Sequence, residues 1–428
     1  MPTLYVHVGM PKTGTTAVQY FMAKNRDVLK QHGAAYPDFG LHYEWVNATR
    51  NGHWLAKAHY SEETAKACFE MVNKLADTYP KIILSDEGLW NSRGSHPSFW
   101  KMLRENLRDD MEIKMIACIR RQDLYTYSYW AEQVKAQQKI DFKTYTFREY
   151  LDTGKYEMNF LDYRKYFERV LPVLGKENIL IRVFERDKFI GGSVYADFMN
   201  AVGLTFDESY MIPEDLSNAS IKGSVLEAKR LLNYIPEFSE PGNRVLKYLF
   251  AAQNDLDREG NLSLRDDFPK EERLAFLEKY RESNEWVARN ILGLEDGQMF
   301  TDTFPEDTGD ALPYTMEEMT QVYGSMMLHM LHDIQHVKEV NKEVRENNRI
   351  LTEKLNHVRP VYRILRGIRR RFSRRGKEPD IEELMRADIT AQAETAADMQ
   401  PASASAAERT TDTGTGAAAK AGQEETPA

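Results

Sequence analysis

HVGMPKTGTTAVQYF, residues 7–21, follows a short apolar run and leads into a segment with helical periodicity. Gly9 and Gly14 lie five residues apart. A glycine-bearing loop between a strand and a helix is typical of phosphate binding, because backbone N–H groups and the helix dipole favour an anion there. A standard nucleotide P-loop carries a lysine directly after its second glycine. Here Thr15 occupies that position and the loop's lysine is Lys12, so the sequence predicts a phosphate loop that differs from that of ATP-binding proteins.

Short β-rich runs alternate along the chain with stretches of helical period. The runs are TLYVHV (3–8), KIILS (81–85), IKMIACI (113–119) and NILIRVF (178–184), and a helix is expected from about Thr15 to Gln31. Almost continuously apolar strands separated by helices predict a parallel sheet covered on both faces. We therefore expect residues 1–312 to form an α/β domain that binds its ligands at the carboxyl ends of the strands. The helix-rich region 207–290 is expected to pack against the sheet and to shape the acceptor side.

Composition favours a soluble globular enzyme, since 42% of the 428 residues are hydrophobic. The net charge of −9 argues against general nucleic-acid binding. Because there is neither an apolar stretch of spanning length nor a secretory pattern, we expect a cytoplasmic protein that does not cross a membrane. Cys68 and Cys118 lack zinc-site spacing and are predicted to be reduced core residues.

From residue 330 onward, a seam recurs at alternating spacings of four and three, which is typical of a coiled coil. The seam consists of Met330, Ile334, Val337, Asn341, Val344, Asn348, Leu351, Leu355 and Val358. If Ile334 is position a, Asn341 and Asn348 are also at a, where a buried asparagine favours a parallel pair at a cost in stability. Residues 330–358 therefore form either a homodimeric coiled coil or a long helix folded back on its own domain.

The stretch 359–377 is densely basic and interleaved with apolar residues. A basic amphipathic helix of this kind is typical of a surface that binds anionic membranes, which would make the protein peripheral to the membrane. The alternatives are a polyanion-binding tail and a solvated helix end. We expect residues 313–376 to form a long helix with this basic end. Residues 377–428 carry almost no large apolar side chains and are expected to be disordered.

The opening loop resembles the 5′-phosphosulfate loop of the sulfotransferases that use 3′-phosphoadenosine 5′-phosphosulfate (PAPS). The signature of that family is a Pro-Lys-x-Gly-Thr-Thr core after the first strand. The matching residues here are Pro11, Lys12, Thr13, Gly14, Thr15 and Thr16. The resemblance implies a P-loop-like sulfotransferase fold over about residues 1–300, with PAPS as donor, PAP as product and no metal.

A second motif of that family, an arginine at a strand end and a serine eight residues later, is matched by Arg120 and Ser128 in ACIRRQDLYTYSYW. The resemblance implies that both bind the 3′-phosphate, which a guanidinium and a hydroxyl suit chemically. Arg121 is an alternative to Arg120. In LIRVFERDKF, Phe184 stands where the family usually has a tyrosine near the adenine. ESNEWVARNIL, residues 282–292, resembles the family's closing Ser-Asn segment.

In-line sulfuryl transfer requires alignment and charge stabilisation. Lys12 is expected to stabilise the charge that develops on the leaving phosphate. An alcohol acceptor also benefits from a base, and Glu87 is the first candidate, because KIILSDEGLW places two carboxylates at a strand end and bacterial relatives use a glutamate in a comparable place. Its neighbour Asp86, His7 and His53 are the alternatives.

The expected acceptor is a carbohydrate, as a surface polysaccharide or a glycolipid. Residues 39–60 hold Tyr43, Trp45, Trp54 and Tyr60, which either stack on sugar rings or pack on the domain. Arg93 and His96 are candidates for contact with an acidic sugar. Two other functions fit the sequence less well, a P-loop kinase or NTPase, and a non-catalytic coiled-coil scaffold.

Overall fold

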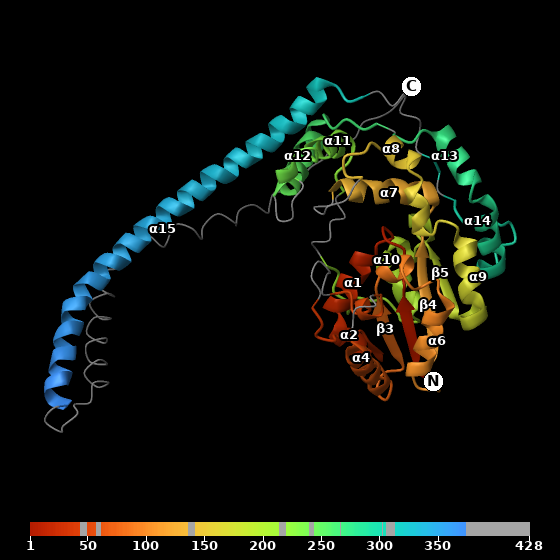
Figure 1. Ribbon diagram of the computed structural model, residues 1–428, viewed down its shortest axis with the longest axis horizontal. Coiled ribbons are helices and arrows are strands. Elements are labelled where there is room, and N and C mark those ends of the chain that lie inside the picture. The colour runs from red at the N-terminus through yellow and green to blue at the C-terminus, as the bar shows by residue number, and fades with distance from the viewer. Residues whose placement is uncertain are drawn as a thin grey trace, which may run out of the picture. The chain divides into compact units, whose positions relative to one another are not determined.

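Figure 1 shows the computed structural model of the chain, which describes residues 1–42, 49–56, 61–135, 142–213, 220–238, 244–265, 267–301, 303–304 and 313–373. The chain divides into two compact units, Met1–Ile334 and Gln335–Ala428. The first unit contains the sheet and its helices. The described part of the second unit is helical.

The first unit is built on a parallel sheet with strand order β2-β3-β1-β4-β5. Its strands are β1 (Thr3–His7), β2 (Ala34–Ala35), β3 (Lys81–Ser85), β4 (Glu112–Ile119) and β5 (Ile179–Val183). The predicted parallel α/β sheet is confirmed, and four strands fall where their apolar runs indicate. The sequence did not reveal β2, because a strand of two residues shows no periodicity. Central β1 pairs with β3 and β4, so the loop that follows β1 emerges between the ends of its two neighbours.

One face of the sheet is covered by α1 (Thr15–Lys24), α2 (Arg26–Gln31) and α10 (Val194–Ala201) (Figure 1). The predicted continuous helix over residues 15–31 is wrong at one point, since α1 ends at Lys24 and Asn25 separates it from α2. The Asn25 side-chain amide donates to the Phe21 carbonyl at 2.8 Å. A local bond of this kind competes with the helical hydrogen bonds, which explains the break.

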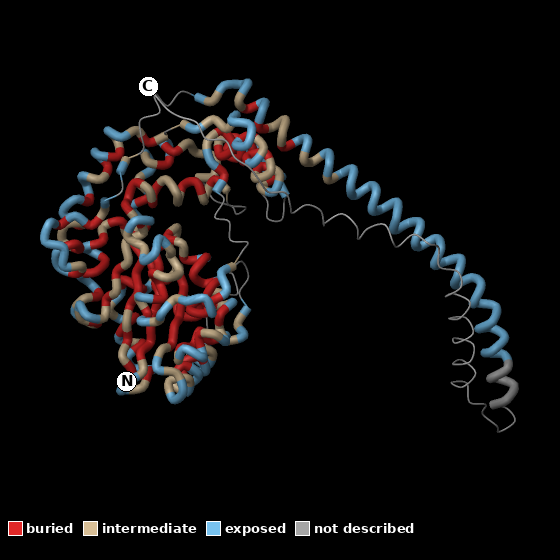
Figure 2. The backbone as a smooth tube through the Cα atoms, turned by 180° about the vertical axis from the view of Figure 1, so that it is seen from behind, coloured by how far each residue is buried: buried red, intermediate tan, exposed pale blue. Residues whose placement is uncertain are grey.

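The opposite face is covered by α4 (Glu62–Leu75), α6 (Pro97–Asn106) and α9 (Tyr163–Leu174). These helices bury aromatic side chains against the strands, and Figure 2 shows the strands as buried segments between exposed helix surfaces. Cys68 and Cys118 are buried and free, as predicted.

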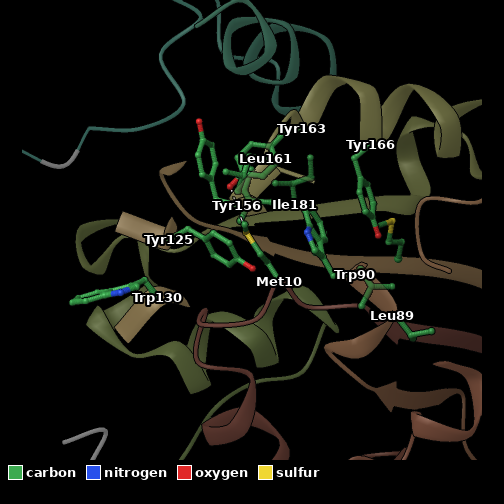
Figure 3. Close-up of a cluster of buried hydrophobic side chains, with 14 of the residues drawn as sticks. Met10, Leu89, Trp90, Tyr125, Trp130, Tyr156, Leu161, Tyr163, Tyr166 and Ile181 are labelled. Atoms are coloured by element: carbon green, nitrogen blue, oxygen red, sulfur yellow. Dashed lines mark hydrogen bonds between the residues drawn. The ribbon is translucent and has the colours of Figure 1, made fainter. Parts of the chain in front are cut away.

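Figure 3 shows the aromatic core that lies behind the opening loop. The Trp90 and Tyr166 rings stack with centroids 4.0 Å apart. The Tyr163 hydroxyl lies 3.4 Å from Met10 Sδ and also donates to the Arg120 carbonyl. This core therefore fixes the loop after β1 and the end of β4 relative to each other.

The remaining α-helices in the described part of the first unit, apart from the start of α15, range from 4 to 15 residues in length. They are α3 (His53–Ala56), α5 (Gly88–Asn91), α7 (Gln122–Lys135), α8 (Phe147–Asp152), α11 (Gly223–Leu232), α12 (Val245–Glu259), α13 (Lys270–Glu278) and α14 (Arg281–Val287). The described residues of region 207–290 are mostly helical, and no strand lies among them, as predicted. Helices α11 and α13 pack on α7, which begins just after β4 ends.

The last described residues form α15 (Met316–Ser373), so the predicted long C-terminal helix is confirmed. Met319, Val322 and Met326 are buried in the core of the first unit. Residues 335–367 are all exposed, as the colour of the tube in Figure 2 indicates. No described helix combines the length and apolar character needed to cross a membrane. The predicted boundary at residue 312 remains a prediction, and the predicted disordered tail, residues 377–428, lies outside the described residues.

Candidate active site

The loop between β1 and α1 presents a helix N-terminus at the carboxyl edge of the sheet. Gly14 is the N-cap of α1, with a φ of 74° that favours glycine. Thr15 and Thr16 begin the helix, and N–H groups in a first turn have no partner within the helix. Buried Thr13 donates its hydroxyl to the Met10 carbonyl at 2.6 Å, which tightens the turn.

Helix α7 supplies the opposite wall. Ser128, Glu132 and Lys135 follow one another at spacings of four and three, so they share one face of the helix. Arg120 lies at the end of β4, and its guanidinium donates to the Lys12 carbonyl at 3.2 Å. The strand end, the loop and α7 therefore meet.

Between these elements lies a cavity of about 660 Å³, here called the loop cavity. Its lining consists of Pro11, Lys12, Gly14, Thr15, Thr16, Glu87, Arg120, Ser128, Tyr129, Glu132, Lys135, Phe184 and Ser220. Eight of the nine residues predicted to hold a nucleotide are in this lining, and the ninth, Thr13, is buried beneath it. The volume is in the range of small-molecule sites.

Lys12 reaches from the loop to α7. Its ammonium lies 2.9 Å from Glu132, and Lys135 binds the same carboxylate at 2.8 Å. Burial opposes ionisation of Glu132, but the two lysines lower its pKa to about 2. The backbone of Lys12 has a φ of 66°, which is uncommon for a residue other than glycine. The loop cavity thus has two cations joined by one carboxylate on its wall.

Phe184 closes the loop cavity just beyond the end of β5. The Arg120 guanidinium carbon lies 5.6 Å from the centroid of its ring. A methyl group at Gly14 would lie only 3.1 Å from Phe184 Cε2. Gly14 therefore serves two purposes, because it adopts the positive φ and leaves room for the aromatic ring.

Glu87 follows the end of β3 and also faces the loop cavity. Two groups orient its carboxylate. The Arg50 guanidinium lies 3.1 Å from Glu87 Oε1, and the Gln19 amide donates to Glu87 Oε2 at 2.7 Å. The Glu87 side chain is 19% exposed, so it remains accessible from the cavity.

Asp86 is enclosed beside it. It is fully buried, and Arg50 donates to both of its oxygens, at 3.0 and 2.8 Å. His53 Nδ1 lies 2.7 Å from one oxygen, and the Gly88 amide donates to the other at 2.6 Å. Burial opposes ionisation, yet the hydrogen bond with His53 and the Arg50 guanidinium hold the pKa of Asp86 below its usual value. Its oxygens are occupied, so of the two carboxylates only Glu87 is available to a substrate.

The segment that carries Arg50 is fixed to the end of β3. The Asn51 side chain accepts from the Ser85 amide at 2.8 Å and donates to the Ile83 carbonyl at 3.0 Å. The Gly52 amide donates to the Ser85 carbonyl at 3.1 Å. Arg50 is thereby held at the strand end that also carries Glu87.

His7, one of the predicted alternative bases, does not line the loop cavity. It is 1% exposed, and its Nδ1 lies 2.8 Å from the Ser85 hydroxyl. Burial lowers the pKa of His7 to about 4, against a smaller opposite effect of Asp86. A histidine buried in this way lacks the access that a base for an acceptor needs. His53, the other alternative, is buried beside Asp86.

Arg121 lies away from the loop cavity, so the arginine that enters it is Arg120. Arg121 is buried and pairs with Asp123 at 2.7 Å. It lines a separate hollow between α13, α14 and residues 296–301 and 304. In the Ser-Asn segment on α14, Ser283 accepts from the Arg164 amide at 2.9 Å, and the side chains of Asn284 and Gln122 exchange hydrogen bonds. These bonds tie α14 to the first turns of α7 and α9.

The residues considered for an acceptor are dispersed. Trp54 is buried, and its ring packs 5.0 Å from that of Phe69, so it belongs to the core. Arg93 and His96 line another hollow beside α6. The predicted sugar-stacking residues Tyr43, Trp45 and Tyr60 lie outside the described residues.

Several residues of the site were not found from the sequence. They are Gln19, Arg50, Tyr129, Glu132, Lys135 and Ser220. A signal existed for Glu132 and Lys135, because they lie four and seven residues after Ser128 on a helix. Arg50 had none, since it reaches Glu87 only through the folding of residues 50–53 onto β3. Among the described residues, no group of three or more acidic, histidine or cysteine side chains is arranged to hold a metal ion.

Comparison with known proteins gives distant likenesses. No family model matches the sequence. An uncharacterised protein of Archaeoglobus fulgidus is 28% identical over 185 residues, which are 43% of this chain and 47% of that protein. The chain thus matches about half the length of this relative.

Two solved structures are similar at a low level. A sulfotransferase from Alicyclobacillus acidocaldarius has a TM-score of 0.31 and 16% identity, over 55% of this chain and 96% of that one. The sulfotransferase domain of the Synechococcus PCC 7002 olefin synthase has a TM-score of 0.28 and 14% identity, over 52% of this chain and 81% of that one. Likenesses of this size leave the function to be inferred from the loop cavity.

Proposed function

We propose that the chain is a sulfotransferase that moves the sulfuryl group of PAPS to a hydroxyl of a carbohydrate. The observation that carries the proposal is the meeting of Gly14, Arg120 and Ser128 in the loop cavity, with Glu87 on the same lining. These residues come from three separate strand ends. A nucleotide with charge at two ends needs two anion sites and a base-stacking side chain between them.

The donor would lie with its 5′-phosphosulfate at the N-terminus of α1. First-turn N–H groups and the helix dipole favour an anion there. Arg120 and Ser128 would bind the 3′-phosphate through charge-assisted hydrogen bonds. Phe184 would face the adenine. Thr15 stands where ATP-binding loops have their lysine, which favours PAPS over a nucleoside triphosphate.

In the transfer step, the acceptor oxygen attacks sulfur while the bond between sulfur and the bridging phosphate oxygen breaks. The acceptor's proton passes to the Glu87 carboxylate, and the products are a sulfate ester and PAP. Arg50 and Gln19 hold Glu87 in place for this role. Lys12 would stabilise the charge on the departing phosphate, a contribution of roughly 3 kcal/mol in comparable sites.

A carbohydrate is proposed as the acceptor because Glu87, a candidate base, lines the loop cavity. A sugar hydroxyl has a high pKa, so a base should raise its rate of transfer on the order of 10²- to 10⁴-fold. A glycolipid or surface polysaccharide precursor would suit the basic end of α15. Val361, Tyr362, Ile364 and Leu365 are exposed there among arginines, and such a face binds anionic lipid surfaces. Residues 374–377 of this predicted surface lie outside the described residues.

The donor is tested by thermal stabilisation of the full chain with PAP, ATP and ADP. We expect PAP to raise Tm most, and an equal or larger effect of ATP would contradict the proposal. Transfer of labelled sulfate from PAPS into extracts of the source cells would then identify the acceptor. Binding of PAP without transfer to any fraction would instead favour the non-catalytic scaffold.

The membrane contact is tested separately by flotation with anionic and neutral vesicles. The expected result is flotation with anionic vesicles only, decreasing with salt. Absence from both vesicle fractions would remove the membrane proposal and leave the enzymatic one intact.

A further inference from the structure

We propose that residues 334–358 of α15 form a parallel, in-register coiled coil with a second copy of this chain. The inference is independent of the enzymatic proposal. The apolar side chains of the seam are half exposed or nearly so: Ile334 48%, Val337 52%, Val344 49%, Leu351 56%, Leu355 60% and Val358 52%. Helices in water gain most of their stability from packing an apolar face, so an exposed stripe of this length requires a partner.

The seam keeps the heptad register over 25 residues, about the three to four heptads that indicate a coiled coil. The a positions are Ile334, Asn341, Asn348 and Leu355, and the d positions are Val337, Val344, Leu351 and Val358. On the outer face, Arg349 pairs with Glu346 at 2.6 Å and with Glu353 at 2.8 Å. The ion pairs therefore lie on the side that a dimer would leave in solvent, and the seam ends before Pro360.

Charges beside the seam favour the parallel orientation. The e positions are Lys338, Arg345, Thr352 and Arg359, and the g positions are Asp333, Val340, Asn347 and Lys354. An antiparallel pair places e positions against each other, so basic side chains would meet. A parallel pair places each e position beside the preceding g position of its partner. Lys338 then faces Asp333, the carboxylate that also pairs with Lys247. Arg345 and Thr352 face uncharged residues, and only Arg359 meets a like charge.

The two asparagines fix the register. In a parallel pair without offset, Asn341 faces Asn341 and Asn348 faces Asn348 of the second copy, so each amide has an amide partner. A slip of one heptad would set one asparagine of each chain against an apolar residue, which leaves a polar group without a partner. The geometry thus points to a single alignment.

The first test is the mass of the full chain in solution. We expect twice the chain mass of 49.6 kDa by light scattering at micromolar concentration. Leu351→Lys should give the monomer mass. Its matched control is Ile350→Lys, one residue away at outer position c, which should remain a dimer. A monomeric wild-type chain, or a dimer that survives Leu351→Lys, would overturn the proposal, and an unchanged Tm of the sheet domain would show that the variants fold.

The second test distinguishes the orientations. Cys68 and Cys118 are buried, so a cysteine introduced by Val358→Cys is the reactive one. In the parallel pair two such residues face each other, and mild oxidation should give a disulfide-linked dimer. In an antiparallel pair they would be roughly 36 Å apart, and Val358→Cys would cross-link with Ile334→Cys instead. That mixed product, without the self-linked one, would exclude the parallel arrangement.

Discussion

Lys12 and Glu132 form an ion pair of 2.9 Å across the loop cavity, although one lies on the loop after β1 and the other on the third turn of α7. Lys135 pairs with the same carboxylate oxygen, Glu132 Oε2, at 2.8 Å. A negative group in a cavity proposed for an anion competes with the ligand for its lysines. The pair holds the Lys12 side chain in place, and if the loop cavity binds PAPS as proposed, this carboxylate would lower the affinity for the donor.

Replacing Glu132 by glutamine should strengthen PAP binding about tenfold, a change of ~1.4 kcal/mol. The reason is that two lysines would lose a competing carboxylate, and the binding should also become more sensitive to salt. Calorimetric titration at two salt concentrations measures both. Glu168→Gln, at an exposed glutamate on α9, is the matched control. Weaker binding in Glu132→Gln would mean that the carboxylate mainly positions Lys12.

Arg120→Ala should remove most of the preference for PAP over adenosine 5′-monophosphate, which lacks the 3′-phosphate. A hydrogen bond to a charged group contributes about 1.5–3 kcal/mol, so the ratio of the two Kd values should fall by roughly 10- to 150-fold. Arg164→Ala, at an exposed arginine on α9, should leave the ratio unchanged. An intact preference in Arg120→Ala would disprove the assignment of Arg120 to that phosphate.

Glu87→Gln should lower kcat by on the order of 10²- to 10⁴-fold while the Kd for PAP changes little, because the variant loses the base and the ion pair with Arg50 but none of the residues proposed to hold PAP. Asp86→Asn should act differently. It leaves Arg50 without its buried ionic partner, so unfolding should become easier by roughly 3–5 kcal/mol. Rates from PAPS and Tm values separate the two effects. Near-normal turnover in Glu87→Gln would rule out this residue as the base.

His7 should make the chain less stable in mild acid. Its pKa is lowered to about 4 by burial, from an ordinary 6.5, so the unfolded chain binds the proton at a higher pH than the folded one. The contribution of neutral, buried His7 to the free energy of unfolding is fully present above pH 6.5. It is lost as the pH falls toward 4, a decrease of about 3 kcal/mol in all. Denaturant unfolding from pH 7.5 to 4 should show a shallower loss for His7→Asn. Equal slopes in both proteins would contradict a neutral buried His7.

Gly14→Ala should lower both Tm and PAP affinity. The backbone at residue 14 has a φ of 74°, which is unfavourable for alanine, and the new methyl group would lie 3.1 Å from Phe184. Gly154→Ala provides the control, since its φ is 66° and no atom lies within 4 Å of the added carbon. Both variants should lose roughly 1–2 kcal/mol from the backbone, but only Gly14→Ala should weaken PAP binding. Equal PAP affinities would mean that Phe184 is not part of the nucleotide site.

The sequence was sufficient for the features that depend on local patterns. The apolar runs at β1, β3, β4 and β5 marked the strands, and the glycine spacing marked the loop. Eight predicted nucleotide residues line one cavity because parallel strands all end at the same edge of the sheet. The roles of these residues remain a prediction.

What the sequence could not provide depends on contacts between distant segments. Asp86 and Glu87 are neighbours in the chain and equally acidic, and only the folding of Arg50 and His53 over β3 shows that Asp86 is enclosed. Likewise, two adjacent arginines follow β4, and Arg121 lies away from the loop cavity because it pairs with Asp123. Sequence spacing carries no information about such choices.

If the seam pairs in parallel, the exposed apolar and basic residues 359–367 of the two copies lie close together. Both copies would then present their arginine-rich ends from the same end of the rod, so one membrane patch could engage the two together. The second contact would form at the effective concentration set by the first, and avidity of this kind can exceed a single contact by about 10²- to 10⁴-fold. Membrane binding would then depend on the concentration of the protein, because dimers would bind much more tightly than monomers.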